Sequence, residues 1–144
     1  MIEPKTPCLV GAAQVVGRED NPANGLSPAD LIASAVRKAF DDAGVAAETE
    51  LDALAVIRLF ADSSGDAFAS PFGKYENLPW SIAKRAGISA RELIYGPVGG
   101  NTPQMLVNVL AQQVGDGELD IAMVAGGEAL RTQAKAAKAG LDPD

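Results

Sequence analysis

The residues with the most chemical potential lie in a glycine-rich turn, Gly96-Pro-Val-Gly-Gly-Asn-Thr-Pro-Gln104. The turn follows a short apolar stretch and precedes a long uncharged one, so we expect it to join a strand to a helix. The free N–H groups of a helix N-terminus would then point at whatever lies before it, and they favour an anion or a developing negative charge. The candidate substrate-binding residues are Gly99, Gly100, Asn101 and Thr102.

Several functions compete for this turn. A dinucleotide-binding loop requires G-x-G-x-x-G close to the first strand and an acidic residue about 20 positions later, and the spacing here fails. A phosphate-binding P-loop requires G-K-[ST], which is absent. The turn can instead be a nucleophile or substrate site at the entrance to a buried helix. A purely structural explanation also stands, in which Gly99 and Gly100 only permit a tight turn and close helix–strand packing.

The chain has no histidine and one cysteine, Cys8. It therefore cannot supply a Ser-His-Asp or Cys-His mechanism by itself, and a metal site is not expected. Nothing basic is placed to activate Cys8, so we interpret it as a small packing residue. A single cysteine excludes an internal disulfide and favours a reducing, cytoplasmic location.

Size and charge exclude further classes of protein. The 144 residues fit one domain, 1–144, with 47% hydrophobic residues. The net charge of -7 argues against binding nucleic acid through a basic face. The first residues have no basic segment followed by an apolar run, so no signal peptide is expected, and no stretch is suited to span a membrane.

The elements that would position the turn follow from apolar patterning. Alternation of strands with helices predicts an α/β fold with a mainly parallel, mixed sheet and helices on both faces. Ser27-Pro28-Ala29-Asp30 is a typical helix start, and Gly44 ends that helix. The strands are predicted at Cys8–Val16, Leu51–Phe60, Glu92–Tyr95 and Leu119–Ala125. The helices are predicted at 28–43, at 80–86 and at about 103–114, and the tail from Thr132 begins a helix or linker.

The helix at about 103–114 is apolar around most of its circumference and carries no charge. Thr102 is a plausible N-cap, and Pro103 suits the first helical position. A helix that is apolar on most sides is usually buried, so we expect this one to lie between two layers.

A long irregular segment, Ala61–Leu78, precedes the second helix. Most of the aromatic residues lie in or beside it. They either hold the segment against the core or form an interface or pocket wall, and the sequence leaves both open. The residues are Phe60, Phe68, Phe72, Tyr75 and Trp80.

The order of strand, glycine turn, uncharged helix and Asp120-Ile-Ala-Met-Val-Ala-Gly-Gly-Glu128 resembles the N-terminal half of the thiolase family, closest to sterol-carrier-type thiolase-like proteins. The first predicted strand and helix are similar too, so the resemblance covers essentially the whole chain. It implies an acetyl-CoA acetyltransferase-like acyltransferase acting on or binding acyl-CoA thioesters, with a CoA thioester as substrate or ligand and no cofactor. It also implies that the helix at about 103–114 is the buried middle layer of a two-half fold.

The resemblance places the family's nucleophilic cysteine at or beside Asn101, where this chain has no thiol. The family's histidines belong to the C-terminal half, which is absent here, so we expect no turnover from this chain alone. No catalytic residue is assigned. Alternatives are a non-catalytic acyl-CoA-binding or scaffold subunit and a nucleotide-binding α/β domain. A half fold would expose apolar surface, so the expected partners are further copies of the chain or a C-terminal thiolase-like half.

Overall fold

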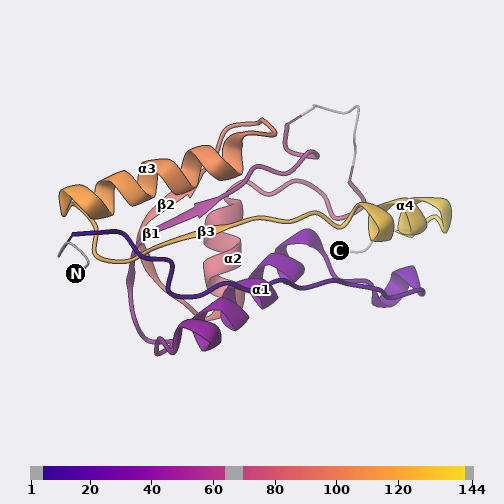
Figure 1. Cartoon of the computed structure of the whole chain (residues 1–144). Coiled ribbons are helices and arrows are strands. Elements are labelled where there is room, and N and C mark those ends of the chain that lie inside the picture. Colours follow the sequence, from indigo (N-terminus) through magenta and orange to yellow (C-terminus); the bar gives the residue numbers. More distant parts are fainter. Residues whose placement is uncertain (1–4, 64–69, 142–144) are drawn as a thin grey trace.

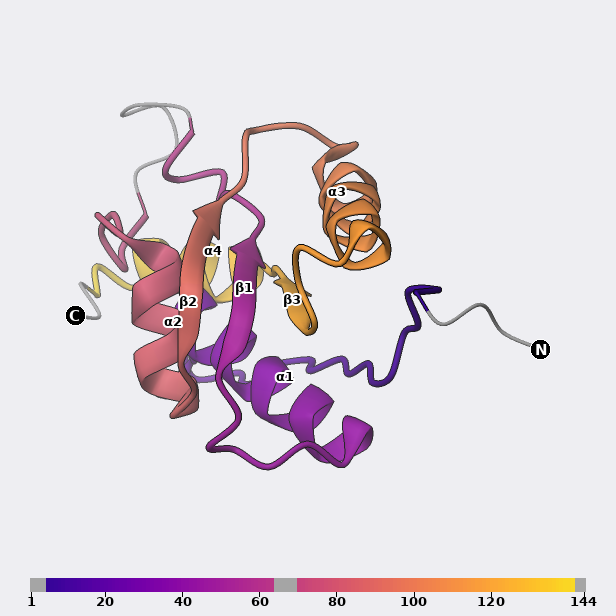
Figure 2. The ribbon, with the colours of Figure 1, turned by 90° about the vertical axis from the view of Figure 1, so that its left-hand side faces the viewer.

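The computed structural model describes residues 5–63 and 70–141, and it shows one parallel sheet in the order β2-β1-β3 (Figure 1). The central strand β1 pairs in parallel with both neighbours. The strands are β1 (Leu51–Val56), β2 (Ala90–Tyr95) and β3 (Ala122–Ala125). Helices α1 and α2 cover one face of the sheet and α3 covers the other (Figure 2). The predicted α/β class, parallel pairing and two-sided helical cover are therefore confirmed.

Strand β1 is buried along its whole length, and its side chains differ between the two faces. Leu54 and Val56 belong to the larger core with α1 and α2, whereas Ala53 and Ala55 face α3. Alternation along a strand sends successive side chains to opposite faces. The small alanines let α3 approach the sheet closely, and the larger residues fill the space under α1 and α2.

The first two helices begin and end at the predicted signals. The Ser27 hydroxyl accepts a hydrogen bond from the Asp30 N–H at 3.1 Å, and Gly44 ends α1 in the left-handed conformation. In α2, the Asn77 side chain accepts from the Trp80 N–H. The bounds of these helices are α1 (Pro28–Ala43) and α2 (Leu78–Ala86).

The remaining helices are η1 (Pro22–Asn24), α3 (Thr102–Asp116) and α4 (Leu130–Lys138). The tail was predicted to begin a helix or a linker, and it forms the helix α4. This helix begins at Leu130, two residues before Thr132. Across the described ranges, the search for a helix with the length and hydropathy of a membrane span finds none.

The prediction that the helix at about 103–114 is buried is wrong for this chain. Only Thr102, Leu106 and Leu110 of α3 are buried, and Val107 and Val109 are each 48% exposed. Figure 2 shows α3 as an outer layer. The absence of charge predicted burial, but of the described residues only the segment at Lys5 and Pro7 lies beside the outer side of α3, near the end of the helix.

The predicted buried strand at Cys8–Val16 is also wrong. The segment is extended but pairs with no strand, and Cys8 is exposed rather than packed. Its backbone is tied to α1, because the Ala12 N–H donates to Asp42 at 2.9 Å. Gly11 permits this approach, since a Cβ there would lie 2.6 Å from the Ala39 carbonyl oxygen. Residues 8–16 have the apolar composition of a strand, but no strand of the described residues pairs with them.

The aromatic residues of the long connection divide between the two proposed roles. Tyr75 packs against the core, which fits the holding role. Phe60 and Trp80 remain exposed, and the Lys84 ammonium lies 5.0 Å from the Trp80 ring. Phe68 lies outside the described residues.

A buried carboxylate ties β3 to β1 at the amino end of the sheet. Asp52, on β1, is only 6% exposed and forms an ion pair with Arg91. Its Oδ2 atom accepts from the N–H groups of Asp120 at 2.6 Å and Ile121 at 2.9 Å. The carboxylate therefore holds the segment that leads into β3.

We expect Asp52→Ala to reduce the free energy of unfolding by about 2 kcal/mol, because it leaves the part-buried N–H groups of Asp120 and Ile121 without their acceptor. Urea unfolding followed by circular dichroism measures the change. The control is Glu50→Ala, an exposed carboxylate two residues away, which we expect to change stability by no more than about 0.5 kcal/mol. Equal effects of the two variants would contradict this role for Asp52.

Candidate functional site

The glycine turn lies at the carboxyl end of the parallel sheet, where the segments after β1, β2 and β3 meet. This is the end at which open α/β sheets bind ligands. The Gly96 N–H donates to the Val56 carbonyl at 2.8 Å, so the turn starts against β1. A Cβ on Gly96 would lie 3.1 Å from side-chain atoms of both Leu106 and Thr102. Glycine at this position therefore allows the close packing of α3 on the sheet.

The four candidate binding residues are adjacent in one turn, but they contribute differently. Thr102 is the first residue of α3 rather than its cap, and its side chain is buried. Its hydroxyl donates to the Pro97 carbonyl at 3.0 Å, and its N–H donates to the Gly99 carbonyl at 3.1 Å. Thr102 thus maintains the turn through its hydroxyl and its N–H.

Asn101 occupies the N-cap position of α3, which sequence reasoning gave to Thr102. It is exposed, and its side chain makes no capping hydrogen bond. A Cβ on Gly99 would lie 2.8 Å from Asn101 Oδ1, so the amide folds back over Gly99. Gly100 faces open space. Of the four candidate residues, Gly99, Gly100 and Asn101 are exposed, whereas Thr102 is buried.

A brace of side chains that sequence reasoning did not find joins the segments after β1 and β2. The Tyr95 hydroxyl donates to Asp62 and accepts from the Leu59 N–H at 3.2 Å. The Arg58 guanidinium lies 4.0 Å from the centre of the Tyr95 ring and donates to the Gly96 carbonyl at 3.2 Å. Burial, followed by the Asp62 hydrogen bond, raises the pKa of Tyr95, so the phenol stays protonated.

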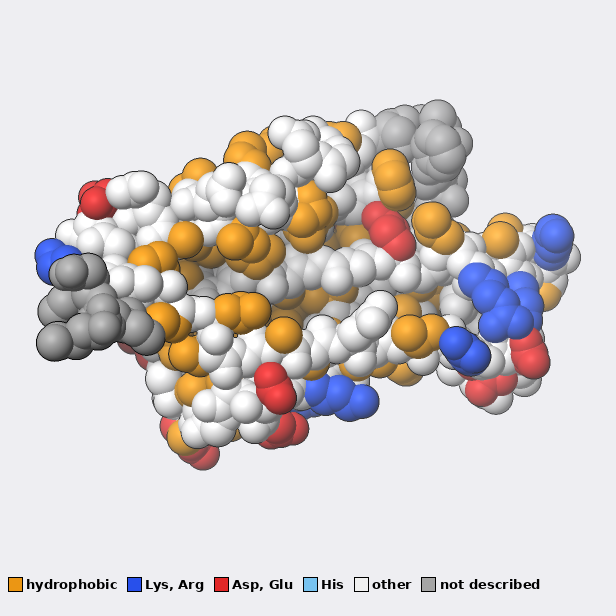
Figure 3. Space-filling view, in the orientation of Figure 1, with side chains coloured by type: hydrophobic (Ala, Val, Ile, Leu, Met, Phe, Trp, Pro, Cys, Tyr) orange, Lys and Arg blue, Asp and Glu red, His pale blue; other side chains and the backbone are white. Residues whose placement is uncertain are grey.

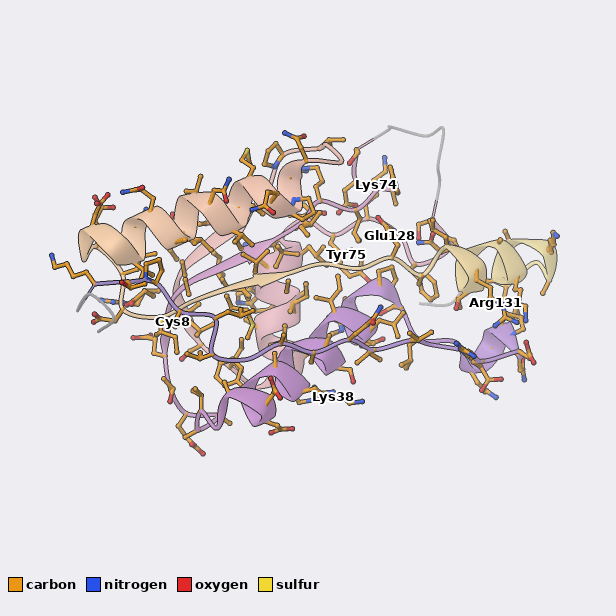
Figure 4. The ribbon with its side chains drawn as sticks, viewed as in Figure 1. Cys8, Lys38, Lys74, Tyr75, Glu128 and Arg131 are labelled. Carbon is orange, nitrogen blue, oxygen red and sulfur yellow. The ribbon has the colours of Figure 1, made fainter. Side chains whose placement is uncertain are left out.

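Glu128, from the Ala125-Gly-Gly-Glu128 stretch, adds the segment after β3 to the same end of the sheet (Figure 4). Its Oε1 atom accepts from the Phe60 N–H at 2.9 Å. Its Oε2 atom is buried and has no hydrogen-bond partner among the described residues. Burial raises the pKa of Glu128; the Phe60 N–H opposes this shift and the charge of Asp62 adds to it. A buried oxygen without a partner disfavours the ionised form.

The remaining reactive groups do not gather at the turn. Figure 4 shows Cys8 toward the end of the molecule where α3 finishes, whereas the turn precedes the start of α3. Within residues 5–63 and 70–141, no group of three or more His, Cys, Asp or Glu side chains could hold a metal ion. Surface hollows of about 370 and 310 Å³ lie elsewhere, one beside α3 and the other between α1 and α2.

The arrangement can position a helix N-terminus and an exposed amide, but it holds no nucleophile with an adjacent base. Arg58 donates to the backbone of the turn at Gly96, and Tyr95 holds the segment after β1 through Leu59 and Asp62. A sequence signal for them existed, because Tyr95 ends β2 and Arg58 lies two residues after the apolar strand β1. Asp62 gave no such signal, since it lies within a polar loop.

Comparison with known proteins identifies the fold. No protein-family model and no curated protein matches the sequence. Among solved structures, the chain is similar to a monomeric SCP2-thiolase-like protein type 1 from Mycobacterium smegmatis, with a TM-score of 0.70 and 26% identical residues. The match covers 90% of this chain and 25% of that protein. The chain therefore has a thiolase-like fold and spans about a quarter of the length of that protein.

We expect Glu128→Gln to raise the melting temperature at neutral pH. The pKa of Glu128 is higher in the folded than in the unfolded state, so the carboxyl group stabilises the fold below its unfolded pKa. That contribution is lost as the pH rises through the folded pKa. The glutamine side chain stays neutral and keeps an acceptor for the Phe60 N–H. The variant therefore does not lose stability as the pH rises.

Thermal unfolding of both proteins from acidic to neutral pH tests this expectation. The advantage of the variant should disappear at acidic pH, where the wild-type carboxyl group is protonated. Glu118→Gln, at an exposed site, is the control and should show no such dependence. A constant difference at all pH values would argue against a titrating Glu128.

Proposed function

We propose that this chain is the N-terminal domain, residues 1–144, of a thiolase-type acyltransferase relative located in the cytoplasm. The turn from Gly99 to Thr102 binds the thioester group of an acyl-CoA. The observation that carries this proposal is the thiolase-like fold over nine-tenths of the chain, with the turn placed at the carboxyl end of the sheet. A helix N-terminus and the Asn101 amide can donate hydrogen bonds to a thioester carbonyl oxygen.

By itself, the chain binds acyl groups without transferring them. The turn has no thiol, and the whole sequence has no histidine to serve as base. In a Claisen condensation a thiolate takes the acyl group from CoA, and a second acyl-CoA, deprotonated next to its carbonyl, attacks that acyl group. Neither the thiolate nor the base is available at Asn101. A non-catalytic acyl-CoA-binding or scaffold subunit is therefore the main alternative, supported by the exposed Asn101 amide.

The partner is a C-terminal thiolase-like half that packs against the outer side of α3. This surface is uncharged: Gln104, Asn108 and Gln112 are exposed on it, and Val107 and Val109, each 48% exposed, lie on its two flanks. Figure 3 shows hydrophobic side chains along α3 at the top of the molecule. Exposed apolar surface of this kind is typical of an interface. A second copy of this chain could occupy the same surface, although the similar protein from Mycobacterium smegmatis is described as monomeric.

Titration with acetyl-CoA tests the binding proposal. We expect a chemical-shift change or heat of binding that maps to residues 99–102, and a weaker affinity for Asn101→Ala because the exposed amide is removed. Gln112→Ala, an exposed amide distant from the turn, is the matched control and should leave the affinity unchanged. Absence of binding at millimolar acetyl-CoA would exclude acyl-CoA binding by this chain. The same titration with ATP and NAD tests the nucleotide-binding alternative.

A cysteine introduced at residue 101 tests the electrostatics of the turn. In a Cys8→Ser background, we expect Asn101→Cys to react with iodoacetamide roughly tenfold faster than Gln112→Cys, because a helix N-terminus lowers a thiol pKa. The pH dependence of the two rates gives the two pKa values. Equal pKa values would mean that the turn does not stabilise negative charge at the proposed nucleophile position.

A further inference from the structure

The hollow between α1 and α2 carries more positive than negative charge. Its volume is about 310 Å³, and hollows of roughly 300 Å³ or more hold small molecules in other proteins. Two arginines and one aspartate line it, in a chain whose net charge is -7. A concave positive patch on an acidic protein attracts small anions. The lining residues are Leu26, Asp30, Ala33, Ser34, Arg37 and Arg85.

The spacing of residues on α1 explains why a hollow forms there. Asp30, Ala33, Ser34 and Arg37 are three or four positions apart in turn, so they share one face of the helix. The two middle residues are small, which leaves room between the charged side chains at either end. Arg85, from the last turn of α2, lies on the opposite side of the hollow.

Arg85 is held in place by the one carboxylate of the lining. Its Nε atom donates to Asp30 Oδ1 at 3.0 Å, and Asp30 Oδ2 accepts from the Ser27 hydroxyl at 2.6 Å. Both oxygens of Asp30 are therefore engaged within the chain. The Nη atoms of Arg85 form no hydrogen bond with the other described residues, so they remain available as donors.

Arg37 supplies the charge that the chain does not neutralise. Its Nη1 atom donates to the Arg85 carbonyl at 2.7 Å, which orients the guanidinium but carries no compensating charge. No carboxylate within residues 5–63 and 70–141 forms an ion pair with Arg37. In the same ranges the Ser34 hydroxyl has no hydrogen-bond partner. The hollow thus combines one uncompensated cation with further unused donors.

This charge balance indicates the class of anion. Asp30 offsets one arginine, so a single negative charge on the ligand neutralises the hollow. A phosphate dianion would instead leave excess negative charge beside Asp30. A planar carboxylate matches the forked N–H groups of a guanidinium. Leu26, 48% exposed, provides apolar surface next to these donors.

We propose that the hollow between α1 and α2 binds a small monocarboxylate with a short apolar chain. The carboxylate lies between the guanidinium groups of Arg37 and Arg85 and accepts a hydrogen bond from the Ser34 hydroxyl. The apolar chain packs on Leu26. Figure 2 shows α1 and α2 on the side of the sheet opposite to α3, so this site is separate from the outer side of α3. It does not rest on the proposed function.

Titration with sodium butanoate, followed by the amide chemical shifts of the protein, tests the site. We expect millimolar binding with shifts in residues 30–37 and around Arg85. Arg37→Gln should weaken the affinity roughly tenfold, because it removes the uncompensated charge. Arg37 is exposed, so the fold should be retained, which circular dichroism checks. Ser34→Ala, a second variant that alters no charge, should weaken the affinity a few-fold.

The matched control for Arg37→Gln is Lys38→Gln. Lys38 is the next residue on α1, exposed and outside the lining of the hollow, and its removal changes the net charge by the same amount (Figure 4). It should leave the affinity for butanoate unchanged. An equal loss in the two variants would mean that butanoate responds only to the overall charge, and the proposed site would be wrong.

Two further probes test the ligand class. Methyl butanoate has the same chain without the charge, and inorganic phosphate has the charge without the chain; both should bind more weakly than butanoate. Equal binding of the ester would overturn the role of the arginines, and tighter binding of phosphate would overturn the choice of a monocarboxylate. The proposal also fails if butanoate causes no shifts beyond those caused by sodium chloride at the same ionic strength.

Discussion

The structure depends on the complete burial of β1 between two unequal layers. Large side chains under α1 and α2 and small ones under α3 fix which helix lies on which face. Gly96 extends the same constraint to the start of α3, since a side chain there would meet Leu106 and Thr102. The position of the glycine turn therefore follows from packing against β1, as well as from the turn residues themselves.

The carboxyl end of the sheet is rigid because backbone groups there are held by side chains. Tyr95, Arg58 and Asp62 join the segments after β1 and β2, and Glu128 joins the segment after β3. None of these residues needs to contact a ligand to matter for function. They fix the direction of α3 and therefore the direction in which its N-terminal N–H groups point. A preorganised dipole of this kind stabilises charge without first having to rearrange.

Two surfaces of the molecule differ from an ordinary protein exterior. The outer side of α3 and the N-terminal segment 8–16 both lack charge, in a chain whose net charge is -7. The chain matches 25% of the similar thiolase-like protein.

The sequence alone determined the features that local chemistry controls. Ser27 and Gly44 bound α1 because a hydroxyl cap and a left-handed glycine act within one turn of helix. The parallel α/β class followed from the order of apolar stretches, and the thiolase-like fold followed from residues 93–128. Strand ends were less accurate: β1 stops at Val56 rather than Phe60, because pairing rather than composition ends a strand.

Only the tertiary structure decided burial and pairing. The valine-rich residues 8–16 have the pattern of a strand, but a strand needs a neighbour, and the described chain places none beside them. The uncharged helix α3 reads as an interior helix, but it is exposed because nothing described packs on its outer side. The brace around Tyr95 joins residues 33 positions apart in sequence. Caps and turns depend on neighbours along the chain, whereas burial and pairing depend on surfaces that only folding or a partner brings near.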